Sequence, residues 1–488
     1  MKNDHFLKNY TCDARYWDEM YDSKAVRRPY SSVFSSLQQI NTETLISKHN
    51  IASELFMNQG ITFTVYNNDE GIERIFPFDI IPRIITGGEW QQIEQGIAQR
   101  LKALNLFIKD IYNEQQVIHD GIIPASLIAT CPHYKREIFG IKVPYDIYVH
   151  ISGIDLIRGK DGKFYVLEDN LRTPSGVSYM LENREVTKRI FPDMLAANRV
   201  RRISSYPVIL HEILLELAST QISNPRVVLL TPGIYNSAYY EHSFLARQMG
   251  IDLAEGRDLV VENHKVYMKT TKGLEQVHVI YRRIDDEYLD PLVFLKNSAL
   301  GVPGLISAYR KGNVAIVNAV GNGVADDKAV YAYVPELIKY YLNEAPILEN
   351  IPTYQLSDPD ARKYVLENHR NMVIKSTNQS GGYGMIMGNA ITEKDWLKAK
   401  VIIENNPRNY IAQPIVALST VPCFIDGKVV PRHVDLRPYA LYGPRGVQLV
   451  PGGLTRVALK EGSLIVNSSQ GGGSKDTWII DEPLQFSR

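Results

Sequence analysis

The sequence predicts a mixed α/β protein that is built from more than one packed unit. Its 488 residues exceed the size at which one hydrophobic core usually serves a whole chain. From residue 202 onward, apolar segments of strand length alternate with helix-like segments, as in a parallel α/β unit. Before that point, residues 145–176 indicate two strands joined by a Lys-Asp-Gly turn at 160–162, which is the pattern of a hairpin.

Residues 1–130 are predicted to be mixed in structure and mainly helical. Within residues 87–118, apolar side chains recur at helical spacing and form a stripe that is most simply core: Trp90, Ile93, Ile97, Leu101, Leu104 and Ile108. An Asp-Gly turn at 120–121 follows this stretch.

The later elements are expected in a regular order. The hairpin strands are predicted at 145–158 and 163–170, followed by helices at 206–220, 236–250 and 329–342. Further strands are predicted at 226–233, 265–269, 277–283, 314–320, 372–375 and 409–416. After residue 435 glycines concentrate in GPRG, PGGLTR and SSQGGGSKD, the last of which could be a lid or a mobile loop.

Composition narrows the class of protein. Lys+Arg and Asp+Glu are both 54, so the formal net charge is zero, which argues against nucleic-acid binding through a bulk positive field. The N-terminus lacks an apolar stretch of signal-peptide length, and no segment approaches a membrane span. Cys12, Cys131 and Cys423 show no metal-ligand spacing. We therefore expect a reduced, cytoplasmic protein.

A candidate metal site lies on the predicted hairpin. Side chains alternate along a strand, so Glu168 and Asn170 point to one face and Asp169 to the other. The hairpin could bring Asp155 beside Glu168, which would gather three oxygen ligands of the kind that Mg²⁺ prefers. Such a set of ligands could hold two metal ions that bridge the phosphates of a nucleotide. A hairpin with merely solvated carboxylates explains the same residues about equally well.

A second candidate site is VIKSTNQSGGYGM, residues 373–385, where a strand ends at Lys375 and a glycine-rich segment follows. Gly381, Gly382 and Gly384 would let backbone N–H groups approach an anion without hindrance from Cβ atoms. The segment contains neither a Walker motif nor a GxGxxG pattern. Taken alone, it indicates a plain glycine hairpin more often than a loop that covers phosphates.

Two neighbours of this segment favour phosphates. Asp327 and Lys328 open a predicted helix before Lys375, and the strand at 409–416 offers Gln413 to an adenine edge. A lysine at a helix start, a second lysine with a glycine flap, a hinge strand and an Asp/Glu-x-Asn metal set together resemble the ATP-grasp superfamily. In most members the metal half follows the nucleotide half, whereas here Asp155 precedes Lys328.

This order resembles a circularly permuted ATP-grasp protein of the glutathionylspermidine synthase-like branch. Residues 168–176, EDNLRTPSG, are similar to that branch's Glu-x-Asn followed by Thr-Pro. Residues 230–251 and 325–342 resemble bacterial proteins of the same permuted class. The sequence departs from the synthases at Gly153, where they have an arginine, and it lacks an amidase-type Cys/His domain.

The resemblance implies a circularly permuted ATP-grasp core, a preceding parallel α/β (pre-ATP-grasp-like) unit and a largely helical N-terminal region. The implied segments are 1–130 for the helical region, 131–201 for the metal half, 202–325 for the parallel, substrate-side unit and 326–488 for the nucleotide half. The implied ligands are Lys328 and Lys375 for the α- and β-phosphates, Gly381, Gly382 and Gly384 over the phosphates, Gln413 at the adenine, and Asp155, Glu168 and Asn170 for Mg²⁺.

Catalytic and substrate candidates are less specific. Arg172, Arg437 and Arg456 could contact the γ-phosphate, although a structural role explains Arg437 and Arg456 equally well. Arg282 and Arg283 end a predicted strand, where they could clamp a carboxylate or pair with Asp285 or Asp286. Further candidates on the substrate side are Ser175, Glu241 and His242, of which His242 is more simply a helix-cap residue.

The function that the resemblance implies is an ATP- and Mg²⁺-dependent carboxylate–amine ligase. A substrate carboxylate would take the γ-phosphate to give an acylphosphate, and an amine would then displace phosphate. Small acid and amine substrates, peptide or amino-acid-like, are the expected partners, without nucleic acid or membrane. Two alternatives remain: an ATP-binding module that works through a partner protein, and a phosphotransferase with the same fold.

Overall fold

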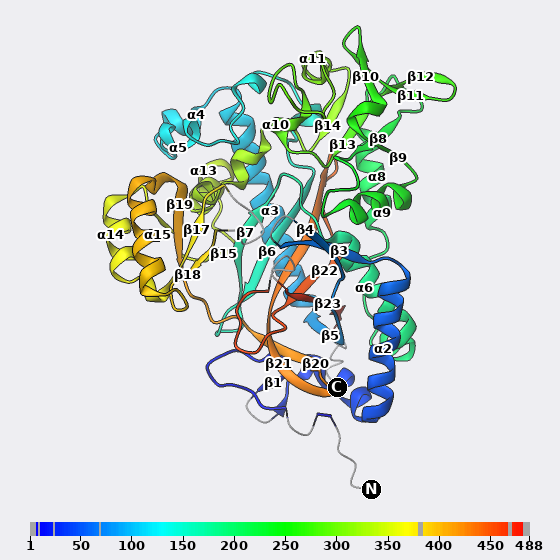
Figure 1. The fold of residues 1–488 in the computed structure, drawn as a ribbon, viewed down its shortest axis with the longest axis vertical. Coiled ribbons are helices and arrows are strands. Elements are labelled where there is room, and N and C mark those ends of the chain that lie inside the picture. Colours follow the sequence, from blue (N-terminus) through cyan, green and yellow to red (C-terminus); the bar gives the residue numbers. More distant parts are fainter. Residues whose placement is uncertain are drawn as a thin grey trace.

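A mixed sheet of eight strands forms the centre of the computed structural model (Figure 1). The structure describes residues 6–7, 10–22, 25–67, 70–378, 384–466 and 471–481. Strands of the central sheet follow the order β15-β7-β6-β21-β22-β23-β5, and β20 pairs with β21. Their bounds are β5 Phe78–Thr86, β6 Ile151–Arg158, β7 Phe164–Asn170, β15 Glu349–Asn350, β20 Thr420–Ile425, β21 Lys428–Gly443, β22 Gly446–Val457 and β23 Gly473–Ile480.

The predicted hairpin is confirmed as β6 and β7. All eight residues of β6 are buried, which explains its nearly continuous apolar sequence. Gly162 adopts a φ of +79° in the connecting turn, a conformation that favours glycine. In the antiparallel register Asp155 lies opposite Glu168, and Gly153 lies opposite Asn170. The two predicted metal-site carboxylates are therefore cross-strand neighbours.

The predicted parallel unit is confirmed as a four-stranded sheet in the order β14-β13-β8-β9. Its strands are β8 Val227–Leu230, β9 Asp252–Ala254, β13 Val279–Arg282 and β14 Ala315–Val317, with helices α8 Tyr206–Glu216 and α9 Tyr239–Met249 beside it. The predicted strand at 265–269 is not part of this unit. It belongs to a separate antiparallel sheet of β10 Leu259–Glu262, β11 Lys265–Thr270 and β12 Gly273–Val277.

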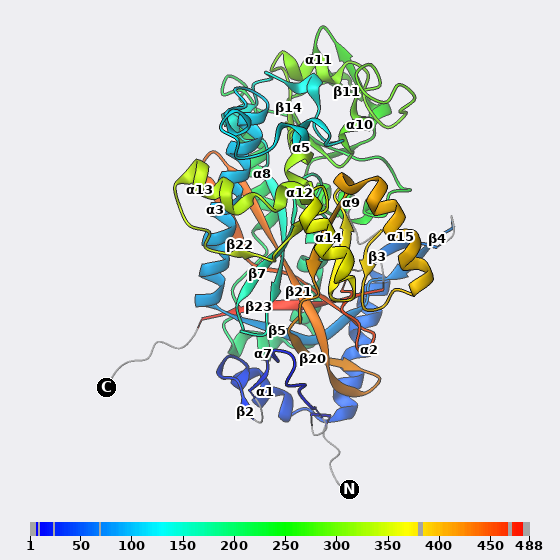
Figure 2. The same ribbon diagram turned by 90° about the vertical axis from the view of Figure 1, so that its left-hand side faces the viewer.

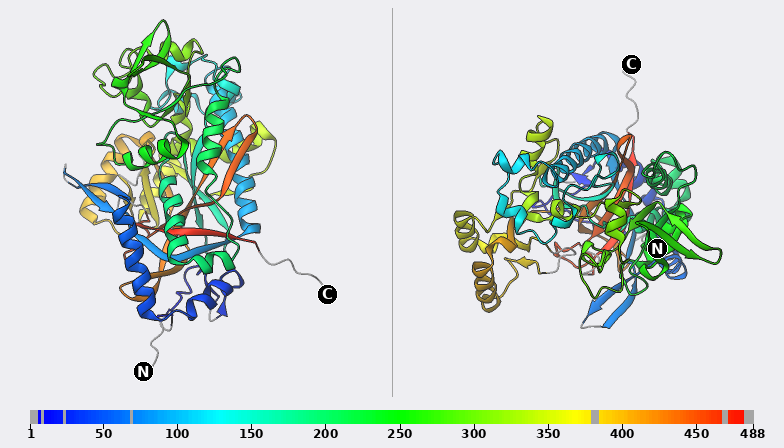
Figure 3. Two further views of the ribbon diagram at one scale, coloured as in Figure 1. Left: turned by 90° about the vertical axis from the view of Figure 1, so that its right-hand side faces the viewer. Right: turned by 90° about the horizontal axis from the view of Figure 1, so that it is seen from above.

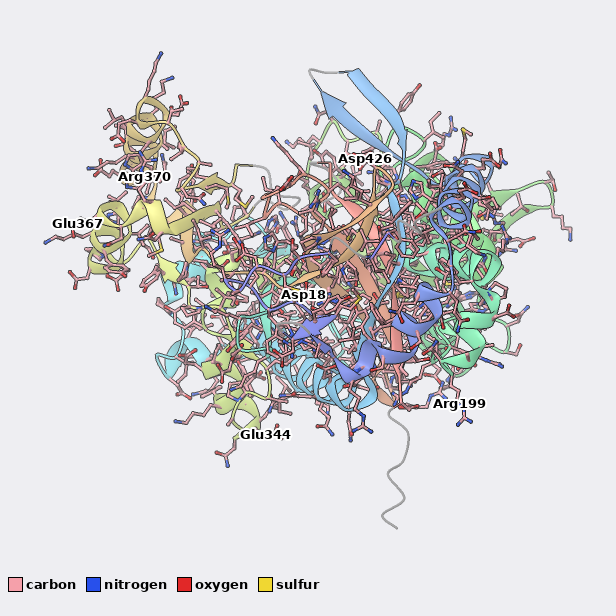
Figure 4. The ribbon with its side chains drawn as sticks, turned by 90° about the horizontal axis from the view of Figure 1, so that it is seen from below. Asp18, Arg199, Glu344, Glu367, Arg370 and Asp426 are labelled. Atoms are coloured by element: carbon pink, nitrogen blue, oxygen red, sulfur yellow. The ribbon has the colours of Figure 1, made fainter. Side chains whose placement is uncertain are left out.

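A third sheet, in the order β16-β19-β17-β18, builds a lobe at the side of the molecule. Its elements are β16 Tyr354–Gln355, α14 Pro359–Glu367, β17 Met372–Ser376, β18 Ile386–Met387, α15 Glu393–Asn405 and β19 Tyr410–Pro414. The lobe has its own apolar core, formed by Leu356, Val365, Met372, Ile374, Trp396, Ile403 and Ala412. Figure 4 shows Glu367 and Arg370 on this lobe, which stands out from the body of the protein.

Helix α3, Gly87–Ile111, stands beside the central sheet and packs against β5, β22 and β23 (Figure 2). The predicted apolar stripe is confirmed, since all six of its residues are buried. Seen from above, the sheet lies between α3 and the helices of residues 177–250 (Figure 3). Of these helices, α6 (Val177–Ile190) packs against β22 and β23, and α8 packs against β21.

The first 130 residues contain both helices and strands, and most of their regular structure is helical. They include β1 Tyr21–Asp22, β2 Ala25–Val26, β3 Thr62–Asn67 and β4 Glu70–Ile75 as well as β5. Because β5 pairs with β23, the central sheet draws strands from three of the four expected segments. The remaining helices are α1 Ser31–Gln38, α2 Thr42–Asn58, α4 Gln116–His119, α5 Ala125–Ala129, α7 Pro192–Ala197, α10 Asp286–Leu289, α11 Leu305–Arg310, α12 Lys328–Tyr331 and α13 Val334–Leu342.

Across the described residues, no helix combines the length and the hydropathy that a bilayer span requires. The cysteines Cys12, Cys131 and Cys423 are all free thiols. Burial raises the pKa of each thiol to about 12, so all three stay protonated at neutral pH and are poor nucleophiles.

A capping box begins α3. The Thr86 Oγ1 accepts a hydrogen bond from the Glu89 N–H at 3.2 Å, and the Glu89 Oε2 accepts one from the Thr86 N–H at 2.9 Å. We expect Thr86→Ala to lower the free energy of unfolding by about 1 kcal/mol, because it leaves a helix N–H without its side-chain acceptor. Urea denaturation followed by circular dichroism measures this change. Thr86→Ser keeps the acceptor and should match the wild type; an equal loss in both variants would contradict the capping role.

Candidate active site

A small, narrow pocket lies where the lobe meets the central sheet. Four separate stretches of the sequence line it. They contribute Leu167, Glu168 and Asp169 from β7, Asp326, Lys328 and Tyr331 from the region of α12, and Lys375, Ile411 and Gln413 from β17 and β19. The structure thus brings the two predicted lysines, the predicted adenine residue and one predicted metal ligand into a single pocket.

Lys328 enters the pocket from the first turn of α12. Asp327 is the N-cap of this helix and accepts a hydrogen bond from the Ala329 N–H at 2.8 Å. The Lys328 N–H donates to the Thr377 carbonyl at 3.0 Å, which joins α12 to the strand end that precedes the glycine-rich segment. The Lys328 Nζ lies 2.8 Å from the Glu168 Oε1. A lysine of the nucleotide half therefore pairs with a carboxylate of the metal half.

Lys375 enters the same pocket from the lobe. Its Nζ donates to the Gln413 Oε1 at 2.7 Å, and the Gln413 Nε2 donates to the Thr353 Oγ1 at 3.0 Å. Removal from water lowers the pKa of Lys375 to about 8, and the charges of Lys328 and Arg456 act in the same direction. Gln413 thus orients a lysine that gives up its proton more readily than an ordinary one.

This lowered pKa predicts a pH dependence of nucleotide binding. The ammonium form of Lys375 is the one that attracts phosphate, and it is lost as the pH rises through about 8. We expect the Kd for an ATP analogue to rise about tenfold between pH 7 and pH 9, since binding must then restore the proton. Calorimetric titration measures the effect. A Kd that stays constant in the wild type over this range would contradict the assignment, and Lys375→Arg should show no such rise.

Asp155 lies under two arginines of the C-terminal strands. The Arg437 Nε and Nη2 lie 2.5 and 2.8 Å from its two carboxylate oxygens, and the Arg456 Nη2 lies 2.7 Å from Oδ2. Burial alone would raise the pKa of Asp155, but the two guanidinium groups hold this pKa well below its ordinary value. Arg456 also pairs with Asp435, its cross-strand neighbour. Two of the predicted catalytic arginines therefore meet the metal half.

The residues proposed for Mg²⁺ fit a hard cation in kind. Asp155, Glu168 and Asn170 share one face of the hairpin, and carboxylate and amide oxygens are the ligands that Mg²⁺ prefers. In the structure as it stands, however, Lys328 pairs with Glu168 and two arginines pair with Asp155. Within the described ranges, no group of three or more His, Cys, Asp or Glu residues is arranged to hold a metal ion.

The predicted glycine flap is described only in part. Gly381 and Gly382 lie outside the described residues. Gly384 has a φ of +69°, in the left-handed region that favours glycine. The flap's role toward phosphates therefore stays a prediction.

Arg172 reaches an acidic residue that the sequence argument missed. Its Nε donates to the Asp326 Oδ2 at 2.6 Å, while the Asp326 Oδ1 accepts the Leu171 N–H at 2.6 Å. Arg172 also lies 3.9 Å from Asp285, on the loop after β13 of the parallel unit. Asp326 directly precedes Asp327 and Lys328 in the sequence. This proximity to the predicted lysine could have identified Asp326 as a residue of the site.

The predicted substrate residues form hydrogen bonds and ion pairs with other residues of the protein. Arg282 donates to the carbonyls of Asn318 and Ile284 at 2.8 Å and pairs with Asp286 at 2.7 Å. The predicted alternative of a salt bridge to Asp286 is therefore present, but as a buried pair and not at the surface. His242 is buried, with Nδ1 2.9 Å from the Thr231 Oγ1, and burial lowers its pKa well below the ordinary value.

Glu241 and Arg283 hold the segment between β7 and α6, which contains Ser175. The Glu241 carboxylate accepts the Gly176 and Ser178 N–H groups at 2.7 and 3.1 Å, and it pairs with Arg283 at 3.0 Å. Arg437 and Tyr439 donate to the Ser175 carbonyl at 3.2 and 2.9 Å. These contacts therefore shape the loop that joins β7 to α6 within the predicted metal half.

Comparison with known proteins agrees with this arrangement. The family model described as circularly permuted ATP-grasp type 2 matches residues 82–458, which include both lysines and the Asp155–Glu168 hairpin. The chain is a circularly permuted ATP-grasp protein of type 2. The finer likeness to glutathionylspermidine synthases stays a prediction.

Relatives of this permuted ATP-grasp protein cover nearly its whole length. An uncharacterized protein of Synechocystis sp. is 51% identical over 96% of this chain and 98% of its own. A Frankia alni protein named "Putative glutamate–cysteine ligase 2-3" is 39% identical over 95% of this chain but only 54% of its own. A glutathione synthetase-like effector from Globodera pallida has a similar fold, with a TM-score of 0.57 at 11% identity over 90% of this chain and 98% of its own.

Proposed function

We propose that the protein is an ATP- and Mg²⁺-dependent carboxylate–amine ligase. The observation that carries this proposal is the meeting of Lys328 and Lys375, from two separate segments, in one pocket lined by Glu168. The two lysines share this pocket with the carboxylates Glu168, Asp169 and Asp326, of which Asp169 pairs with Arg100 and Asp326 with Arg172. Two ammonium groups in one pocket suit the phosphate oxygens of a nucleotide triphosphate.

The proposed reaction has two balanced steps. A carboxylate oxygen of the acid substrate attacks the γ-phosphorus, and the bond to the β-phosphate oxygen breaks to release ADP. The amine substrate then attacks the acyl carbon, inorganic phosphate leaves, and the amine gives up a proton. Both steps develop negative charge on phosphate oxygens, which Lys328, Lys375 and the arginines are placed to offset.

Magnesium would be held by Glu168 and Asn170. Asp155 would join them once its carboxylate is released from the two arginines. When bound, Mg²⁺ supplies charge neutralisation to the phosphates. The side chains of this chain contribute the rest: Gln413 orients Lys375, and the N-cap Asp327 fixes the helix start that presents Lys328.

The relatives point to a class of substrate. The name of the Frankia alni protein specifies an amino acid with a free carboxylate and a second amino acid with a free amine. This chain spans about half of that protein, so the named activity belongs to the longer polypeptide. We therefore propose small amino-acid or peptide substrates and leave the particular pair to experiment.

The direct test follows phosphate release with ATP, Mg²⁺ and separate pools of amino acids, short peptides and polyamines. We expect at least one combination of pools to raise phosphate release above the ATP-only rate, and Lys375→Ala to remove this increase. If ATP binds and no combination raises the rate, the ligase proposal fails. A phosphorylated product that accumulates without free phosphate would favour a phosphotransferase instead, and ATP-dependent binding of a protein without turnover would favour a binding module.

A further inference from the structure

The two arginines beside Asp155 are held differently. Arg456 lies opposite Asp435 in the β21–β22 register, and its Nε donates to the Asp435 Oδ1 at 2.9 Å. It would therefore keep a carboxylate partner if Asp155 were withdrawn. Arg437 pairs with Asp155 through two nitrogens, and its Nη1 donates to a neutral group, the Ser175 carbonyl, at 3.2 Å. The charge of Arg437 is thus balanced chiefly by Asp155.

Gly153 provides the space that Arg437 occupies. A Cβ atom at Gly153 would lie 3.0 Å from the Arg437 Cδ and 3.3 Å from the Pro174 Cβ, closer than most real contacts. Gly153 also lies opposite Asn170 in the hairpin register. The arginine side chain therefore crosses the same face of the hairpin that carries the proposed metal ligands.

A metal ion and Arg437 compete for the same carboxylate oxygens. Both oxygens of Asp155 are engaged, one by Arg437 alone and the other by Arg437 and Arg456. A cation that approached them would meet two guanidinium groups, and the neighbouring Glu168 is neutralised by Lys328. Phosphate oxygens, by contrast, offer guanidinium groups the bidentate partner that they prefer.

We propose that Arg437 is a positioning residue that withholds Asp155 from metal ions until nucleotide phosphates replace this carboxylate as its partner. This inference rests on the proposed ATP site and adds the order in which the nucleotide and the metal ion bind there. The nucleotide-free protein binds a divalent cation weakly, and the metal enters the site together with the phosphates. Withdrawal of Arg437 also breaks its hydrogen bond to the Ser175 carbonyl, which keeps the hydrogen bond from Tyr439.

Electron paramagnetic resonance of Mn²⁺ tests this order without any turnover, because the signal of free aqueous Mn²⁺ falls as the ion binds. In the absence of nucleotide, we expect Arg437→Gln to bind Mn²⁺ at least tenfold more tightly than the wild type. Arg437→Lys keeps the charge and should stay within threefold of the wild type. The double variant Asp155→Asn/Arg437→Gln should lose this increase in Mn²⁺ affinity, because the increase depends on the Asp155 carboxylate.

Arg445 provides a matched control. It lies in the β21–β22 turn and pairs with Glu212 and Glu216, so Arg445→Gln removes one charge away from Asp155 and should leave Mn²⁺ affinity unchanged. Equal Mn²⁺ affinity in Arg437→Gln and the wild type would overturn the proposal. If Arg437→Gln does not fold, Gly153→Ala crowds Arg437 and keeps every charge; it should bind Mn²⁺ about threefold more tightly, and unchanged affinity would overturn the proposal too. An ATP analogue that fails to bind the wild type would instead overturn the proposed function.

Discussion

Replacing Lys375 by alanine should weaken the binding of ATP about 100-fold or more. A charge-assisted contact contributes roughly 1.5–3 kcal/mol, and here the ammonium also offsets phosphate charge. Gln413 cannot replace the ammonium, because its oxygen accepts from Lys375 and its Nε2 donates to Thr353. Calorimetric titration with a non-hydrolysable ATP analogue measures the change.

The matched control for Lys375 is Lys394, an exposed lysine on α15 of the same lobe. Lys394→Ala removes the same charge from the lobe without entering the pocket, so its Kd should stay within about twofold of the wild type. Equal nucleotide affinity in the wild type and Lys375→Ala would contradict the assignment of Lys375 to the nucleotide site, and with it the proposed role of the lobe.

Glu168→Gln should lower turnover about 1000-fold while the Kd for ATP changes by less than about threefold. The amide keeps the size of the side chain but no longer contributes the negative charge on which metal-assisted phosphoryl transfer depends. Nucleotide affinity should persist, because loss of the 2.8 Å ion pair leaves the Lys328 ammonium available to phosphate. Phosphate release in the presence of a stimulating substrate pool gives the rate, and calorimetry gives the Kd.

Glu349 supplies the comparison for Glu168, since it is exposed on β15, the strand that pairs with β7. Glu349→Gln should leave both the rate and the Kd near their wild-type values. Parallel losses of rate and affinity in Glu168→Gln would place this carboxylate in nucleotide binding rather than in the chemical steps.

Local patterns predicted the elements that carry the site. Strand alternation and a Lys-Asp-Gly turn sufficed to place Asp155 beside Glu168, because a hairpin register is set by neighbouring residues. The start of α12 at Lys328 followed from its N-cap Asp327, another local signal.

What the sequence could not predict depends on contacts between distant residues. Arg437 and Asp155 are 282 residues apart, and no local pattern shows that the arginine will neutralise the carboxylate. Arg282 illustrates the same limit in reverse: the end of a parallel strand is a common ligand site, yet here backbone carbonyls and Asp286 surround the guanidinium.

The position of β23 between β22 and β5 bears on how the protein is made. Lys475 of β23 contacts Asp79 of β5, a residue 396 positions earlier. While the ribosome synthesises the intervening chain, β5 lacks this neighbour, and the facing edge of β22 is likewise unpaired. Long-range pairing of this kind slows folding and exposes strand edges to association in the meantime. The nascent chain therefore completes its central sheet only after residues 473–480 have left the ribosome, and N-terminal fragments that end before them carry two open strand edges.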